Sequence, residues 1–231
     1  MSSSPLFYHP GLKPEDGIIQ LEEETRRHVF TVLRMSVGEM LVLTNGRGLS
    51  AEAEIVQADK KQLKVACKNY IQHSEPVQKL LLGISLLKNA ARFEWMLEKV
   101  TEIGITEIVP LLTERTERQH FRKDRFEQIL ISASLQSQRF HFPVLHDPVR
   151  LEDCLTRQEI SNKYIAHCMN GHREKLTGGS SDGILLIGPE GDFTPEELSM
   201  AEAKGYTPVT LGDSRLRTET AGIVGAVMLR G

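Results

Sequence analysis

A cation, a carboxylate and two hydroxyl groups stand together near the end of the chain, in Arg217, Thr218, Glu219 and Thr220. The apolar stretch 221–229 that follows is expected to form a buried helix, and polar groups at the mouth of a buried helix need partners. A bound small molecule is one source of partners. The alternative is local: Thr218 caps the helix, Glu219 interacts with the helix dipole, and Arg217 is a surface residue.

Two glycine turns precede this cluster, and each follows an apolar run. The run 184–187 leads into Gly-Pro-Glu-Gly at 188–191, and the run 209–211 leads into Gly212. Because the runs are apolar, we expect both to be buried strands, and ligands of open α/β sheets bind outside the carboxyl ends of such strands. Glycine also lets the backbone approach a flat ring closely. The pattern indicates a small-molecule site built largely from backbone, although a Gly-Pro turn alone is more often an ordinary strand-to-helix loop.

The elements that must position these turns alternate between strand and helix from residue 79 onward, which predicts an α/β fold with a parallel sheet and crossover helices. Thr194 should open one helix with a capping box, with Pro195 at its first position. The expected strands are 80–86, 108–112, 163–167, 184–187 and 209–211, and the expected helices lie near 93–103, 126–133, 194–204 and 221–229.

Residues 1–73 are expected to form a separate β-rich unit, joined through a polar linker at 73–77 to a second domain at 78–231. Asn45 and Gly46 supply the positive φ angles of a hairpin turn. A chain of this length allows two small domains. The expected strands are 6–8, 18–21, 40–44, 49–57 and 62–70, and one short helix lies near 22–33.

Composition narrows the class of protein. The chain has 231 residues, of which 40% are hydrophobic and 26% charged, with a net charge of −3, as in an ordinary soluble globular protein. The three cysteines form no CxxC pair, so we expect neither a disulfide framework nor a zinc site, and a reducing cytoplasm fits best. We see no signal peptide and no apolar run long enough for a membrane.

Several familiar motifs are absent, among them GxxxxGK[ST], GxGxxG, HExxH and GxSxG, which argues against NTPases, dinucleotide oxidoreductases, zinc proteases and α/β-hydrolases. His167, Cys168 and His172 lie close together in sequence. A strand-end cysteine and two loop histidines explain them without a metal.

Two basic stretches could bind phosphate. Arg115 lies in the cation-rich segment 113–125, and Arg27 and Arg34 could line one side of the short helix 22–33. Neighbouring acids offset much of this charge, so a solvated face explains both stretches as well.

Six segments, taken in order, resemble the ribosomal small-subunit RNA uridine-N3 methyltransferases of the knotted SPOUT superfamily. The match runs from about residue 7 to residue 229, and the order and spacing make it specific. The segments are Val-Leu-Arg-Met at 32–35 with Gly38, Glu-Lys-Val-Thr-Glu-Ile-Gly at 98–104, Leu-Leu-Thr-Glu-Arg at 111–115, Gln-Ser-Gln-Arg at 136–139, Leu-Ile-Gly-Pro-Glu-Gly at 186–191 and Leu-Arg-Thr-Glu-Thr-Ala at 216–221.

The resemblance implies an N-terminal PUA-like β-barrel for RNA and a C-terminal SPOUT-type α/β domain tied in a trefoil knot, an exception to ordinary chain topology. It also implies S-adenosylmethionine as cofactor, no metal, and a homodimer. The implied cofactor-binding residues are Leu112, Ile187, Gly188, Pro189, Glu190, Gly191, Leu211, Gly212, Leu216, Thr218, Thr220 and Ala221. Arg217 and Glu219 are the implied catalytic residues, and the RNA-binding residues are Arg27, Arg34, Arg115 and Arg139.

The implied reaction requires that uracil N3 lose its proton and that N3, methyl and sulfur be aligned. Arg217 is the first candidate to stabilise charge on the uracil ring. Glu219 could accept the proton, but its place in the first turn of a helix makes it a weak base. A SPOUT methyltransferase for another RNA, or an inactive RNA-binding protein, stays an alternative.

Two residues depart from the family pattern. Asp192 follows the Gly-Pro-Glu-Gly turn where the family commonly has a second glycine, and we expect it to alter the edge of the loop. Leu135 stands where the family commonly has a glutamate. The final helix is expected to pack in the dimer interface, with Gly222 and Gly225 admitting another backbone and Arg139 near the partner's cofactor loops.

Overall fold

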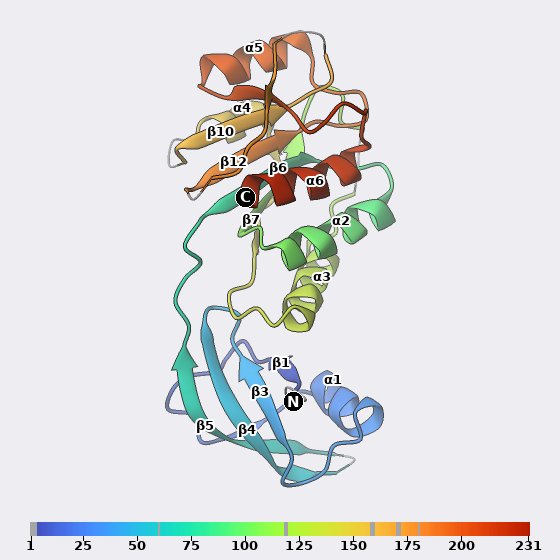
Figure 1. Ribbon diagram of the computed structural model, residues 1–231. Coiled ribbons are helices and arrows are strands. Elements are labelled where there is room, and N and C mark those ends of the chain that lie inside the picture. Colours follow the sequence, from blue (N-terminus) through green and yellow to red (C-terminus); the bar gives the residue numbers. More distant parts are fainter. Residues whose placement is uncertain (1–3, 60, 118–119, 158–159, 170–171, 180) are drawn as a thin grey trace. The chain divides into compact units, whose positions relative to one another are not determined.

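The computed structural model describes residues 4–59, 61–117, 120–157, 160–169, 172–179 and 181–231 (Figure 1). The chain divides into two compact units. The first combines Met1–Glu75 with Ser134–Phe142, and the second combines Pro76–Ala133 with Pro143–Gly231. The segment Ser134–Phe142, which the sequence analysis placed in the larger domain, therefore lies with the smaller unit.

The first unit is built on a five-stranded sheet in the order β1-β3-β4-β5-β2. Its expected β-barrel is not seen, because the described pairings leave β1 and β2 as the two open edges. Closure needs hydrogen bonds between the edge strands, and each of these two strands has only three residues. The strands are β1 (Leu6–Tyr8), β2 (Ile18–Gln20), β3 (Met40–Thr44), β4 (Leu49–Ala58) and β5 (Leu63–Gln72).

The expected helix of the first unit is present but changes its winding. α1 (Glu23–Arg27) continues directly into a π-helix, η1 (His28–Val32), and only Val29 of that turn is buried. Arg34 follows with φ of 54°, in the left-handed region. Such π turns are rare and often lie at functional sites.

The segment Ser134–Phe142 joins the first unit at the β3–β4 hairpin. The Gly48 amide donates to the Phe140 carbonyl (2.8 Å), and the Phe142 amide donates to the Gly46 carbonyl (2.9 Å). Both glycines have positive φ, and a Cβ at Gly46 would lie 2.7 Å from the Phe142 ring. The glycines of the hairpin are therefore needed for its conformation and for the close approach of this distant segment.

The second unit has a parallel sheet in the order β11-β13-β10-β12-β6-β7-β8, with β9 beside β7. Its strands are β6 (Leu80–Ser85), β7 (Glu107–Leu112), β8 (Val144–Leu145), β9 (Val149–Arg150), β10 (Asn162–Ala166), β11 (Glu174–Lys175), β12 (Gly183–Ile187) and β13 (Thr207–Thr210). Its helices are α2 (Ala90–Ile103), α3 (Lys123–Gln136), α4 (Leu151–Leu155), α5 (Pro195–Ala203) and α6 (Thr218–Arg230).

Helices cover both faces of this sheet (Figure 1). On β12, Leu185 and Ile187 belong to the core shared with α2 and α6, whereas Ile184 and Leu186 belong to the core shared with α4 and α5. A central strand buried on both faces reads as a continuous apolar run, as β12 does. The predicted α/β fold with crossover helices is confirmed.

All the longer elements expected in the second unit are present, with ends shifted by a few residues. The expected burial of the 209–211 strand is wrong, because β13 lies next to the edge strand β11 and only Val209 on it is buried. Within the described ranges, no helix is long and apolar enough to cross a membrane.

Candidate functional site

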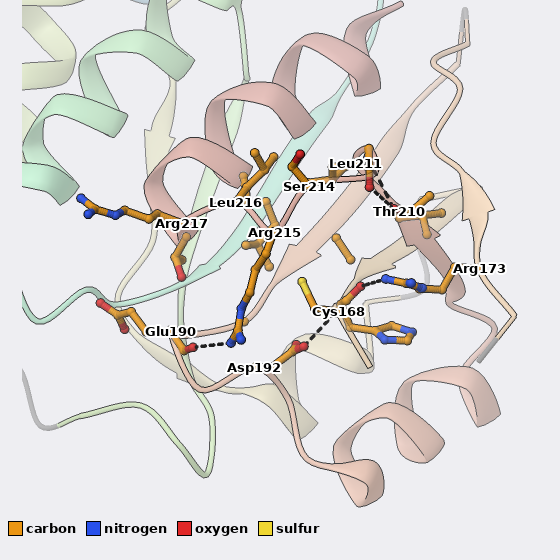
Figure 2. A pocket seen from close by; sticks show the side chains of 18 of the residues that line it. Cys168, Arg173, Glu190, Asp192, Thr210, Leu211, Ser214, Arg215, Leu216 and Arg217 are labelled. Carbon is orange, nitrogen blue, oxygen red and sulfur yellow. Dashed lines mark hydrogen bonds between the residues drawn. The ribbon is translucent and has the colours of Figure 1, made fainter. Parts of the chain in front are cut away.

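A cavity of about 800 Å³ lies at the carboxyl ends of β12, β10 and β13 (Figure 2). The three strands end level with one another, since Ala166 pairs with both Ile187 and Val209. This is the edge at which open α/β sheets bind ligands.

Most of the predicted small-molecule residues line this one cavity. They are Ile187, Gly188, Pro189, Glu190, Leu211, Gly212, Leu216, Arg217, Thr218 and Ala221. The predicted residues that are not among its lining are Leu112, Gly191, Glu219 and Thr220. Leu112 ends β7, which β6 separates from β12. The sequence pattern could not give this strand order.

The first glycine turn packs closely against a buried aromatic ring. A Cβ at Gly188 would lie 3.1 Å from the ring of Phe193, which is fully buried. Asp192 has φ of 64°, a conformation that favours glycine and that aspartate tolerates better than most residues. The departure from the family pattern therefore occupies a position where a glycine would fit without strain.

Arg115 stabilises this turn through hydrogen bonds. Its Nη1 donates to the carbonyls of Gly191 (2.7 Å) and Phe193 (3.4 Å). The capping box predicted at Thr194 is confirmed, and its partner Glu197 also accepts from the Glu114 amide (2.9 Å). The loop after β7 thus fixes the turn after β12.

The second turn is open. Gly212 has φ of 136°, and a Cβ there would meet no heavy atom within 4 Å. The chain then enters α6, whose N-cap is Arg217 rather than Thr218. The Arg217 side chain is exposed and extends away from the side of the cavity that carries Arg173 (Figure 2).

Glu219 lies apart from the cavity. Its carboxylate is buried and faces Arg92, with 3.6 Å between Oε1 and the arginine Nε. This ion pair links α6 to α2, so Glu219 is placed to stabilise the packing of the two helices. Arg217 is among the residues that line the cavity, whereas Glu219 is not.

Sequence reasoning missed one wall of the cavity, the end of β10. The lining residues outside the predicted set are Ala166, His167 and Cys168 at the end of β10, and elsewhere Arg173, Asp192, Val209, Thr210, Asp213, Ser214 and Arg215. Only the pairing of β10 between β12 and β13 brings its end into the site. Among the described residues, no group of three or more His, Cys, Asp or Glu side chains is placed to hold a metal.

The lining combines apolar and charged side chains, which suits a small molecule that has both apolar and charged groups. Ile187, Leu211, Leu216 and Ala221 give apolar wall, and the two glycine turns expose backbone. The volume is typical of small-molecule sites.

The other predicted RNA-binding residues lie on the first unit. Arg27 and Arg34 are exposed, on α1 and just after η1. Arg139 is half-buried, and its amide donates to the Ser134 carbonyl (2.8 Å).

The fold and the cavity define an α/β small-molecule-binding domain that carries a second, β-rich unit. A family model described as an RNA methyltransferase domain matches residues 73–230, and one described as an RNA methyltransferase PUA domain matches residues 21–66. The chain belongs to this RNA methyltransferase family.

Relatives named Ribosomal RNA small subunit methyltransferase E align over most of the chain. That of Rickettsia conorii is 28% identical over 226 residues, 94% of this chain and 91% of the relative. That of Buchnera aphidicola is 30% identical over 222 residues, 91% of this chain and 86% of the relative. The crystal structure of the Neisseria gonorrhoeae enzyme of the same name, bound to S-adenosyl methionine, superposes with a TM-score of 0.86 at 27% identity and covers 96% of this chain and 95% of that one.

Proposed function

We propose that this RNA methyltransferase transfers the methyl group of S-adenosylmethionine to N3 of a specific uridine in 16S ribosomal RNA of the small subunit. One observation carries the proposal: the glycine turns and the start of α6, which the family resemblance marks as cofactor loops, line a single cavity. The names of the aligned relatives supply the substrate class.

The chain's own residues would hold the cofactor and shape the reaction. The backbone of the turns at Gly188 and Gly212 and the apolar side chains of Leu211 and Leu216 would hold S-adenosylmethionine. Bound S-adenosylmethionine supplies an electrophilic methyl group. Arg217, which is exposed and lines the cavity, donates to a uracil oxygen and stabilises the charge left when N3 passes its proton to solvent. Glu219 keeps only a secondary role, because it faces Arg92.

The first unit would bind the RNA. Arg27 and Arg34 present exposed guanidinium groups suited to phosphate. We assign RNA binding to residues 1–73 and methyl transfer to residues 78–231. Arg115 would contact RNA while it keeps its hydrogen bonds to the turn after β12. Arg139 would lie near the cofactor loops of a second subunit.

The proposal includes a trefoil knot, a homodimer, a cytoplasmic location and catalysis without a metal. The knot is supported by the route of the last segment. After β13, the chain returns past β10 so that α6 packs against β12 and β6. The homodimer is supported by the outer face of α6, where Val227 is exposed.

The test is transfer of labelled methyl from S-adenosylmethionine to purified small subunits or to free 16S RNA. We expect labelled 16S RNA, and calorimetric binding of S-adenosylmethionine by the protein alone. Cofactor binding with label only in another RNA would indicate a different substrate. Absence of both would indicate an inactive RNA-binding protein.

A further inference from the structure

The loop between β13 and α6 carries an arginine that lines the cavity and is also exposed. Arg215 extends from this loop to the turn after β12, where its Nη2 donates to the Glu190 carbonyl at 3.4 Å (Figure 2). Hydrogen bonds between N–H and oxygen are usually about 2.7–3.2 Å long, so this one is weak. Because Arg215 is exposed, a molecule that approaches from solvent can reach its guanidinium group.

The guanidinium group of Arg215 keeps most of its hydrogen-bonding capacity. Arginine has several N–H donors in a planar fork, and within the described parts of the chain the Arg215 side chain makes only the bond to the Glu190 carbonyl. The carboxylates of Glu190 and Asp213 belong to the exposed lining as well, yet neither forms an ion pair with Arg215 in those parts of the chain. The polypeptide therefore leaves this cation available to a ligand.

Two other charged lining residues are engaged with the backbone. Arg173 is half-buried, and its Nη1 donates to the His167 carbonyl (2.7 Å). Both carboxylate oxygens of Asp192 accept from backbone amides, at 2.7 and 2.8 Å. Among the described lining residues that are exposed, only Arg215 and Arg217 are cations. The proposed function places Arg217 on the uracil ring, so Arg215 is the exposed cation that still lacks a role.

The proposed reaction brings an anion to this part of the cavity. For uracil N3 to reach a methyl group held in the cavity, the RNA backbone beside that uridine must come to the exposed lining. Each nucleotide carries a phosphate, to which an arginine can donate a pair of parallel hydrogen bonds. S-adenosylmethionine instead carries a sulfonium and an ammonium group against a single carboxylate. Its net charge is positive, so an exposed arginine attracts it less than it attracts RNA.

We propose that Arg215 is a substrate-binding residue that donates to a phosphate of the target RNA strand next to the methylated uridine. On binding, the guanidinium group exchanges its weak bond to the Glu190 carbonyl for this contact. The inference rests on the proposed function and names the part of the substrate that the residue recognises. The first unit stays the proposed RNA-binding unit, and Arg215 adds a contact beside the reacting nucleotide.

The test is the KM for free 16S RNA in methyl transfer, measured for Arg215→Ala, Arg215→Lys and Lys204→Ala. We expect Arg215→Ala to raise KM about tenfold, the worth of one charge-assisted hydrogen bond. The kcat should stay unchanged, because the phosphate contact is the same before and during the transfer. Lysine keeps the charge without the fork of donors, so Arg215→Lys should recover part of the affinity. Lys204 is an exposed cation directly after α5 and outside the cavity lining, so Lys204→Ala is the matched control and should leave KM unchanged.

Salt dependence and ligand-free measurements separate an ionic RNA contact from a structural role. For Arg215→Ala, the slope of log(1/KM) against log salt should become shallower by about one, as for one lost phosphate contact. Calorimetric affinity for S-adenosylmethionine and the unfolding temperature should match those of the unchanged protein, because the bond that Arg215 makes within the chain is weak and exposed. A residue that only held the two turns together would lower one of these two quantities when it was removed.

The outcomes distinguish a failure of the inference from a failure of the proposed function. An unchanged KM and salt slope in Arg215→Ala, with 16S RNA still labelled, would overturn the inference alone. A fall in affinity for S-adenosylmethionine that accounts for the whole loss of activity would also overturn it, because Arg215 would then serve the cofactor. If the unchanged protein bound S-adenosylmethionine but labelled no 16S RNA, the proposed function would fall together with the inference.

Discussion

The glycines at the two turns of the cofactor cavity have different surroundings. Gly212 faces open space with φ of 136°, whereas a Cβ at Gly188 would press on the buried Phe193 ring. We predict that Gly212→Val folds, at a strain cost of about 1–3 kcal/mol, and has no measurable affinity for S-adenosylmethionine. Gly188→Val should also lose binding, but with a much larger loss of stability. Calorimetry beside thermal unfolding checks both, and full affinity in folded Gly212→Val would refute the site.

Arg217 and Glu219 are expected to differ in how strongly they affect the rate of methyl transfer. Arg217→Ala should slow methyl transfer by about a hundredfold, the scale of losing one donor to a developing anion, while the affinity for S-adenosylmethionine stays unchanged. Glu219→Gln should have a smaller effect on the rate, because the carboxylate faces Arg92 outside the cavity lining. Single-turnover rates check this. A larger loss from Glu219→Gln than from Arg217→Ala would reverse the assignment.

At the scale of elements, the exposed segment just after η1 is the proposed RNA contact. Arg34→Ala should weaken RNA binding and reduce the slope of log affinity against log salt by about one, as for one lost phosphate contact. Affinity for S-adenosylmethionine should not change, because Arg34 lies on the first unit and the cavity is formed by the second. A fall in cofactor affinity with RNA binding intact would contradict the division of labour.

Periodicity and turn residues were sufficient to predict the longer strands and helices, because each such signal is local. The strand order is not local. The apolar run of β12 and the turn at Gly212 were visible in the sequence, but nothing in it put β10 between β12 and β13. For that reason His167 was weighed as a metal ligand and its place in the cavity wall was missed. The docking of Phe140 and Phe142 on the β3–β4 hairpin was missed for the same reason.

At the scale of the whole molecule, α6 is the proposed centre of a homodimer, but its glycines do not serve that purpose. A Cβ at Gly222 would lie 2.9 Å from Ile84, and one at Gly225 would overlap Leu185. The missing side chains at these glycines let α6 pack closely against the sheet of the same chain. The expectation that they admit a second subunit is wrong.

An exposed residue on the outer face of α6 allows a direct test of the dimer. Val227 is 54% exposed and Val144, on the edge strand β8, is 53% exposed. We predict that Val227→Asp dissociates the dimer in light scattering and that Val144→Asp does not, since only the first charge would be buried at an interface. A monomeric parent protein with full activity would remove the dimer from the account, and an unaffected Val227→Asp dimer would move the interface elsewhere.

The central claim is the site of methylation, and nucleoside mass spectrometry tests it most directly. Small-subunit ribosomal RNA is incubated with the protein and S-adenosylmethionine carrying a deuterated methyl group, and is then digested to nucleosides. We predict that the label appears as 3-methyluridine and that Arg217→Ala reduces it. Label in a ribose-methylated nucleoside, or in a base other than uracil, would contradict the account.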